Sequence, residues 1–181
     1  MIDIDRGFMT DDPSAASSRA PAKGGAIAAL IAAVVLFLSP LTAAHEGTRH
    51  VAYQDFAKKV WTICQGHTGP DVHAGMTATD AQCAAYLRQD LTAKAKAVLA
   101  CTPSLADHPG PLRAATDFAF NAGEGAYCGS TMAKRFSAGD IPGGCAAFLA
   151  WDKARVNGKL VVVRGLAKRR LQEQAICLGR A

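Results

Sequence analysis

Residues 46–69 read EGTRHVAYQDFAKKVWTICQGHTG, and this stretch decides how the rest of the chain is interpreted. It holds Glu46, then Asp55 nine positions later and Thr62 a further seven, and it ends in a Gly-His-Thr-Gly turn. Two carboxyl groups can supply a proton donor on one side of a glycosidic bond and hold an attacking water on the other, with help from a hydroxyl. The stretch therefore predicts a glycosidase that needs no cofactor and no metal ion.

An uncharged apolar segment, residues 24–44, directly precedes this stretch. At about 1.5 Å per residue it is long enough to cross a hydrocarbon layer of about 30 Å. Its large apolar residues contribute only roughly 4 kcal/mol in total to the free energy of membrane insertion, so a helix that spans the membrane would be only marginally stable there. Three interpretations compete: a secretory signal cleaved after Ala44, a retained anchor that can later leave the bilayer, and a buried core helix. We favour the first two, because Lys and Arg residues precede the run, which predicts export of everything after it.

The chain before the apolar segment is polar, with four aspartates and three basic residues in residues 1–23. Such a composition cannot bury enough apolar surface to offset the loss of chain entropy. We therefore expect a disordered cytoplasmic tail at 1–23, a signal-anchor or signal-peptide segment at 24–44, and one folded catalytic domain at 45–181.

All six cysteines follow the apolar segment. An even number on the exported side indicates disulfides, and the absence of a C-x-x-C pair argues against a zinc site. Six cysteines allow 15 pairings. Proximity of the expected elements suggests, without deciding it, the pairs Cys64 with Cys83, Cys101 with Cys128, and Cys145 with Cys177.

The exported part is basic, with 17 Lys and Arg residues against 11 Asp and Glu residues from His45 to Ala181. An excess of positive charge attracts polyanions. An exported protein meets cell-wall polymers and anionic lipid, and the chain has no base-stacking aromatic series, so we expect no nucleic-acid partner. A basic surface without a specific partner is the plainer alternative.

Helical patterns dominate the exported part after one short strand, residues 60–64, which carries Thr62. The sequence Thr79-Asp-Ala-Gln82 is typical of a capping box and predicts a long helix that ends before Pro103. Further helices are expected over residues 112–123, after Ser130, from Asp140 through Trp151, and over 165–178, with a turn at Asn157-Gly158. Strands near the N-terminus followed by many helices indicate an α+β, mainly helical domain.

Ordered motifs along residues 45–181 resemble those of one known family. They are Glu46-Gly47, Tyr53-Gln54-Asp55, Thr62-Ile63-Cys64, Gly66-His67-Thr68, Phe118-Ala-Phe-Asn-Ala-Gly123, Tyr127-Cys-Gly-Ser-Thr131, and Arg164-Gly165-Leu166 with Arg169-Arg170. The chain resembles the T4-type phage lysozymes, glycoside hydrolase family 24, and in particular the endolysins with an N-terminal signal-anchor-release segment. It departs from their pattern in the interval between Asp55 and Thr62, which is seven rather than the usual six. Lys58 and Lys59 stand where the family has glycine, and Gln65 stands where an aromatic residue is common.

The resemblance implies a lysozyme-like fold, with a small N-terminal β-hairpin region and a helical lobe, preceded by the apolar helix. It implies hydrolysis of the β-1,4 bond between N-acetylmuramic acid and N-acetylglucosamine in peptidoglycan. Glu46 would protonate the leaving oxygen, for which partial burial in an apolar cleft is favourable. Asp55 would hold the attacking water together with Thr62, and a carboxyl separation of roughly 6.5 to 9.5 Å would invert the anomeric centre.

Three further residues are candidates for substrate binding, namely His67, Asn121 and Arg164. Each also has a structural explanation, as a turn, packing or salt-bridging residue, and the same holds for Arg169 and Arg170. The resemblance further implies a monomer that is exported to the periplasm of a bacterial host and is first tethered to the inner membrane by residues 24–44.

The position of Glu46 suggests regulation, because it lies two residues after the apolar segment. An embedded segment would pin the glutamate at the membrane surface, and release of the segment, for example when the membrane potential collapses, would let it join Asp55 and Thr62.

Two rival functions stay open. One is a thiol-dependent cell-wall peptidase that uses Cys64 and His67. The other is a non-catalytic, basic wall-binding protein.

Overall fold

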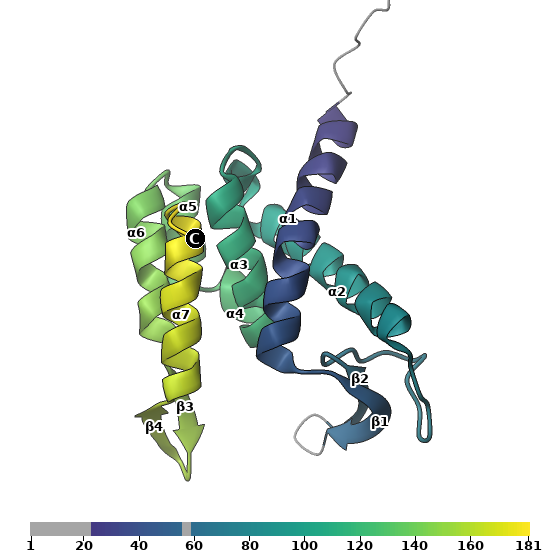
Figure 1. The fold of residues 1–181 in the computed structure, drawn as a ribbon. Helices are drawn as coiled ribbons and strands as arrows, with labels where there is room; N and C mark the ends of the chain where they lie inside the picture. Colours follow the sequence, from purple (N-terminus) through teal and green to yellow (C-terminus); the bar gives the residue numbers. More distant parts are fainter. Residues whose placement is uncertain (1–22, 56–58) are drawn as a thin grey trace, which may run out of the picture.

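The computed structural model describes residues 23–55 and 59–181 (Figure 1). The expected disordered tail lies, apart from Lys23, outside the described residues, as do residues 56–58 of the first hairpin. The elements in chain order are α1 (Lys23–Glu46), β1 (Arg49–Asp55), β2 (Val60–Cys64), α2 (Asp80–Cys101), the 3-10 helix η1 (Pro103–Asp107), α3 (Pro109–Ala122), α4 (Glu124–Cys128), α5 (Thr131–Ser137), α6 (Ile141–Ala146), the 3-10 helix η2 (Ala147–Trp151), β3 (Lys153–Val156), β4 (Lys159–Val162) and α7 (Arg164–Cys177). The mainly helical α+β fold predicted from the sequence is confirmed.

The helix boundaries follow from local chemistry. Thr79 and Gln82 form the expected capping box at the start of α2. The hydroxyl of Ser130 accepts a hydrogen bond from the backbone of α5, and the Asp140 carboxylate accepts one from the backbone of α6. Gly123 ends α3 with a φ of 96°, which a residue with a side chain rarely adopts. The helix expected from Asp140 through Trp151 ends at Ala146 and continues as the 3-10 helix η2, whereas the one expected over 165–178 forms as α7.

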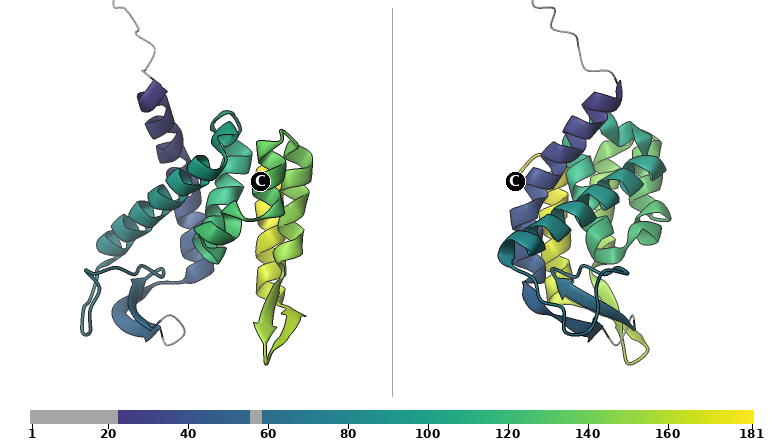
Figure 2. Two further views of the ribbon diagram at one scale, coloured as in Figure 1. Left: turned by 180° about the vertical axis from the view of Figure 1, so that it is seen from behind. Right: turned by 90° about the vertical axis from the view of Figure 1, so that its right-hand side faces the viewer.

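The apolar helix α1 packs against α2 and α3, and its lower half lies inside the fold (Figures 1 and 2). One face is buried in the main core through four apolar side chains, those of Ile31, Val34, Val35 and Leu38. The opposite face is open, with Leu36 78% exposed. Within its span from Gly24 to Glu46, the most apolar window of 18 residues has a mean hydropathy of 2.4, and by length and composition the helix could cross a membrane. The structure therefore describes this segment docked on the domain, the arrangement that the sequence favoured least.

Two β-hairpins lie at the same end of the molecule in all three views (Figures 1 and 2). The first, β1 with β2, was expected; a small second core of apolar residues lies under it. The second, β3 with β4, was not, because the sequence predicted only a turn at Asn157-Gly158 and strands near the N-terminus alone. Both turn residues have positive φ, 48° and 79°, which suits the two-residue turn of a tight hairpin.

Three disulfides connect different elements of the fold, between cysteines that are 19, 27 and 32 positions apart. Cys64–Cys83 joins the end of β2 to α2, Cys101–Cys128 joins α2 to α4, and Cys145–Cys177 joins α6 to α7. These are the pairs that the order of elements suggested. Each link closes a loop in the unfolded chain, so each stabilises the fold by about 3 kcal/mol.

Candidate active site

Glu46 lies where α1 ends and in the wall of a cavity of about 390 Å³. Gly47 follows with a φ of 68°, so the chain leaves the helix at once and turns into β1. The other walls come from the turn after β2, from α2 and from the end of α3, with lining residues that include Gln65, Thr68, Asp90, Lys94, Asn121 and Gly123. The cavity is a hollow between the first hairpin and the helices, with a carboxyl group at one side.

Arg169 of α7 holds the Glu46 carboxylate, with 2.5 Å between Nη1 and Oε1. The guanidinium is itself held by Asp117 of α3, whose Oδ2 accepts from Nε at 3.1 Å and whose Oδ1 accepts from Nη2 at 3.0 Å. This bidentate pairing fixes the plane of the guanidinium. Among the described residues, Arg169 is the only hydrogen-bond partner of the Glu46 carboxylate, so the direction of Glu46 depends on Arg169.

A buried cluster of charged groups surrounds this contact. Arg170 Nη2 donates to Glu173 Oε1 at 2.6 Å and to Asn121 Oδ1 at 2.9 Å, and its guanidinium lies 4.8 Å from the ring centre of Phe118. Burial raises the pKa of Glu173 to about 9, against the opposing effect of Arg170. The guanidinium groups of Arg169 and Arg170 therefore lie among three carboxyl groups, those of Glu46, Asp117 and Glu173.

The first hairpin places Asp55 and Thr62 on one face. Asp55 pairs with Val60, and Tyr53 pairs with Thr62, so all four side chains share a face of the antiparallel pair. Asp55 and Thr62 are diagonal neighbours, a relation that corresponds to roughly 7 Å. Lys59 adopts a φ of 57° where the connection between the strands ends. The pairing of the two strands is regular from Asp55 with Val60 to Tyr53 with Thr62.

The Thr62 hydroxyl is buried and has no hydrogen-bond partner within the part of the chain that the structure describes. Leaving a buried hydroxyl without a partner costs about 1–3 kcal/mol, and such groups often mark functional positions. Neither Asp55 nor Thr62 is among the described residues that line the cavity of Glu46. The structure thus puts the acid in the cavity wall and the other two side chains on the adjoining hairpin.

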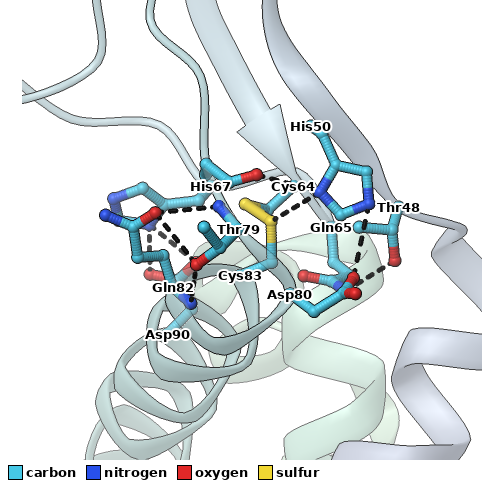
Figure 3. The surroundings of a disulfide bond; sticks show 11 residues. Thr48, His50, Cys64, Gln65, His67, Thr79, Asp80, Gln82, Cys83 and Asp90 are labelled. Carbon is cyan, nitrogen blue, oxygen red and sulfur yellow. Dashed lines mark hydrogen bonds and ion pairs between the residues drawn. A yellow bond between two sulfur atoms is a disulfide. The ribbon is translucent and has the colours of Figure 1, made fainter.

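The turn after β2 is held by several contacts (Figure 3). Gln65 donates to the Thr48 hydroxyl at 2.8 Å, and the Cys64–Cys83 disulfide ties the strand to α2. His67 is buried, with Nδ1 at 3.0 Å from the Asp90 carboxylate and its ring stacked on Tyr86 at 4.1 Å. These contacts suit a structural role for His67.

The remaining predicted residues lie in different surroundings. Asn121 lines the cavity and accepts a hydrogen bond from Arg170 through Oδ1, which leaves its amide nitrogen as a donor. Arg164 is exposed at the start of α7 and is not a lining residue of the cavity. Arg169 and Arg170 are salt-bridging residues, as the sequence suggested.

Two buried acids were missed by the sequence interpretation, Asp117 and Glu173. For Asp117 there was a signal, since it is the one acidic residue in the apolar stretch from Leu112 to Gly123. The thiol-dependent alternative does not fit the structure, because it requires a free thiol at Cys64, and Cys64 is bonded to Cys83. No free cysteine occurs among residues 23–55 and 59–181.

The family model, the sequence relatives and the solved structures that match this chain agree with one another. The family model for phage lysozyme matches residues 43–173. A SAR-endolysin of Enterobacteria phage P21 is 37% identical over 157 residues, which cover 86% of this chain and 89% of the relative. Among solved structures, the muramidase domain of SpmX from Asticaccaulis excentricus has a TM-score of 0.68 and 28% identity, covering 77% of this chain and 93% of that one. An endolysin from Escherichia coli O157:H7 phage FAHEc1 has a TM-score of 0.64 and 30% identity, covering 84% and 92%.

Proposed function

The chain belongs to the phage lysozyme family, and from this premise we propose that Glu46, Asp55 and Thr62 carry out its hydrolysis of peptidoglycan. The enzyme is an endolysin-type glycoside hydrolase, and its bond is the β-1,4 link between N-acetylmuramic acid and N-acetylglucosamine. The observation that carries the assignment of the acid is the position of Glu46, in the wall of the cavity and held by Arg169.

In the proposed reaction Glu46 donates a proton to the glycosidic oxygen as the bond from that oxygen to the anomeric carbon breaks. A water attacks the anomeric carbon from the opposite face of the sugar and gives its proton to Asp55, while the Thr62 hydroxyl orients it. The product is a new reducing end with inverted configuration. The shared hairpin face of Asp55 and Thr62 supports this division of labour, because both side chains can reach one water from adjacent positions.

The test uses the full chain, because α1 contributes both Glu46 and part of the core. Purified enzyme is incubated with peptidoglycan, and new reducing ends are measured. Replacing Glu46→Gln should lower the rate by about 10²–10⁴. The matched control is Glu124→Gln, which removes an exposed carboxylate that pairs with Lys94 at the edge of the cavity and should leave the rate near that of the wild type. Full activity of the Glu46 variant would refute the assignment.

The same measurement separates the remaining alternatives. A non-catalytic wall-binding protein would sediment with peptidoglycan and produce no reducing ends. Transfer of the sugar to an internal hydroxyl would cleave the chain without producing reducing ends, and would appear in the mass of the released fragments as the loss of a water.

We further propose that the enzyme acts as a monomer in the periplasm and is first tethered to the inner membrane by residues 24–44. The length and hydropathy of α1 support a membrane-embedded state, and its packing on α2 and α3 supports a docked state. The large apolar residues of the segment favour membrane insertion by only roughly 4 kcal/mol in total, so the helix can move from the embedded state to the docked state. The mass and N-terminus of the exported form test this: cleavage after Ala44, or wall degradation by the embedded form, would contradict it.

A further inference from the structure

We propose that Asp117 and Thr42 form a positioning pair that holds the last turn of α1 and thereby orients the Glu46 carboxyl group. The inference rests on the proposed role of Glu46 as the acid and assigns function to two residues that do not line the cavity. Neither residue would touch the substrate. Both would act through the position of Glu46.

The pair is formed inside the protein. Thr42 and Asp117 are 0% and 1% exposed, and the Thr42 hydroxyl donates to Asp117 Oδ1 at 3.1 Å. Thr42 lies four residues before Glu46 in the same helix, which places both side chains on one face, one turn apart. The hydrogen bond therefore ties α3 to the turn of α1 that presents the acid.

Asp117 also reaches Glu46 by a second route. It holds the Arg169 guanidinium through two hydrogen bonds, and a third nitrogen of that guanidinium holds Glu46. The contacts form a closed ring, from Thr42 to Asp117, to Arg169, to Glu46, and back along one turn of α1. A ring fixes the carboxyl group more firmly than either route alone, because each contact limits the movement that the others allow.

The end of α1 needs such support. Helix ends fray readily, and Gly47, with its positive φ, ends α1 directly after Glu46. The nearby contact of His45 with Gln172 is exposed, so water competes with it. Small displacements of a catalytic group are costly, since about 1 Å can reduce a rate by about 100-fold.

Ser39 shows what a hydroxyl in α1 does when it has no such role. Its Oγ donates to the Val35 carbonyl within the same helix at 2.7 Å. Thr42 has a carbonyl available at the same spacing, that of Leu38, yet its hydroxyl is directed to Asp117 on another helix. Ser39→Ala is therefore a matched control, because it removes a hydroxyl from the same helix without opening the ring.

The experiment compares four full-length variants on soluble glycan strands that carry their peptides. Thr42→Val keeps the shape and removes the hydroxyl; kcat should fall at least about tenfold with KM unchanged within about twofold. Thr42→Ser restores the hydroxyl and should recover most of kcat. Ser39→Ala should behave as the wild type. Glu46→Gln is included as the test of the acid itself, and thermal unfolding is recorded for every variant.

The outcomes are distinguishable. Loss of kcat in Thr42→Val with recovery in Thr42→Ser supports the positioning pair. Wild-type kcat in Thr42→Val overturns it, and so does a lowered melting temperature with unchanged kcat, which is the result of a merely structural role. Full activity of Glu46→Gln would instead refute the proposed function, whatever the Thr42 variants do.

Discussion

A comparison of two leucines in α1 tests whether this apolar helix is part of the folded enzyme. Leu38 is 0% exposed in the main core, whereas Leu36, two residues earlier, is 78% exposed on the opposite face. Replacement of either by alanine removes the same atoms and lowers the hydropathy of the segment equally. The two variants therefore weaken a membrane span to the same extent and differ only in what they do to the docked state.

The expected difference follows from burial. Removing a buried leucine side chain costs about 2–5 kcal/mol, because transfer energy is lost and a cavity remains. An exposed substitution away from special contacts usually changes stability by less than about 0.5 kcal/mol. For a domain with a total stability of about 5–15 kcal/mol, Leu38→Ala should be clearly destabilised and Leu36→Ala should not.

The assay is urea unfolding of the full-length protein with its disulfides intact, followed by far-UV circular dichroism. The midpoint for Leu38→Ala should lie well below that of the wild type, with a similar slope. Equal destabilisation of the two variants, or none in either, would refute the docking of α1 on the core. If Leu38→Ala loses lytic activity at higher temperature and regains it at low temperature, the loss is caused by unfolding of the variant and not by damage to the active site.

Three further predictions follow from the core, the buried acid and the hairpin. Deleting residues 1–44 removes four buried apolar side chains, whose burial stabilises the folded state by about 6–12 kcal/mol. Residues 45–181 alone should therefore give the circular dichroism spectrum of an unfolded chain. A folded, active fragment would contradict this prediction. Burial raises the pKa of Glu173 from the usual 4.5 to about 9. Between these two pH values the folded state binds more protons than the unfolded state. The free energy of unfolding therefore falls as the pH rises through this window, by up to about 1.4 kcal/mol per pH unit. Glu173→Gln should flatten that dependence in urea unfolding at pH 5 and pH 7, and an unchanged slope would speak against a neutral Glu173. His67→Ala should lower the unfolding free energy by about 1–3 kcal/mol through loss of the Asp90 contact and leave KM unchanged, so a raised KM at full stability would instead indicate substrate binding.

Local sequence patterns were sufficient for many features of the fold. The capping box at Thr79, the caps at Ser130 and Asp140, and the glycine at 123 depend on residues a few positions apart, so they are readable without the tertiary structure. The spacing of Glu46, Asp55 and Thr62 can likewise be read from the sequence without the tertiary structure. The second hairpin was missed although its Asn-Gly turn was recognised, because its strands are short and exposed on both faces and lack a clear alternating pattern.

The sequence by itself determined the family, the mainly helical fold class and the identity of the candidate acid, because each of these is encoded in short ordered motifs. Only the tertiary structure decided that α1 docks on the domain and that Glu46 is held by Arg169. The contacts responsible join residues 75 positions apart, between Thr42 and Asp117, and 123 positions apart, between Glu46 and Arg169. A segment that is apolar throughout suits a bilayer and a protein core equally well, and only the partners that meet its buried face distinguish the two.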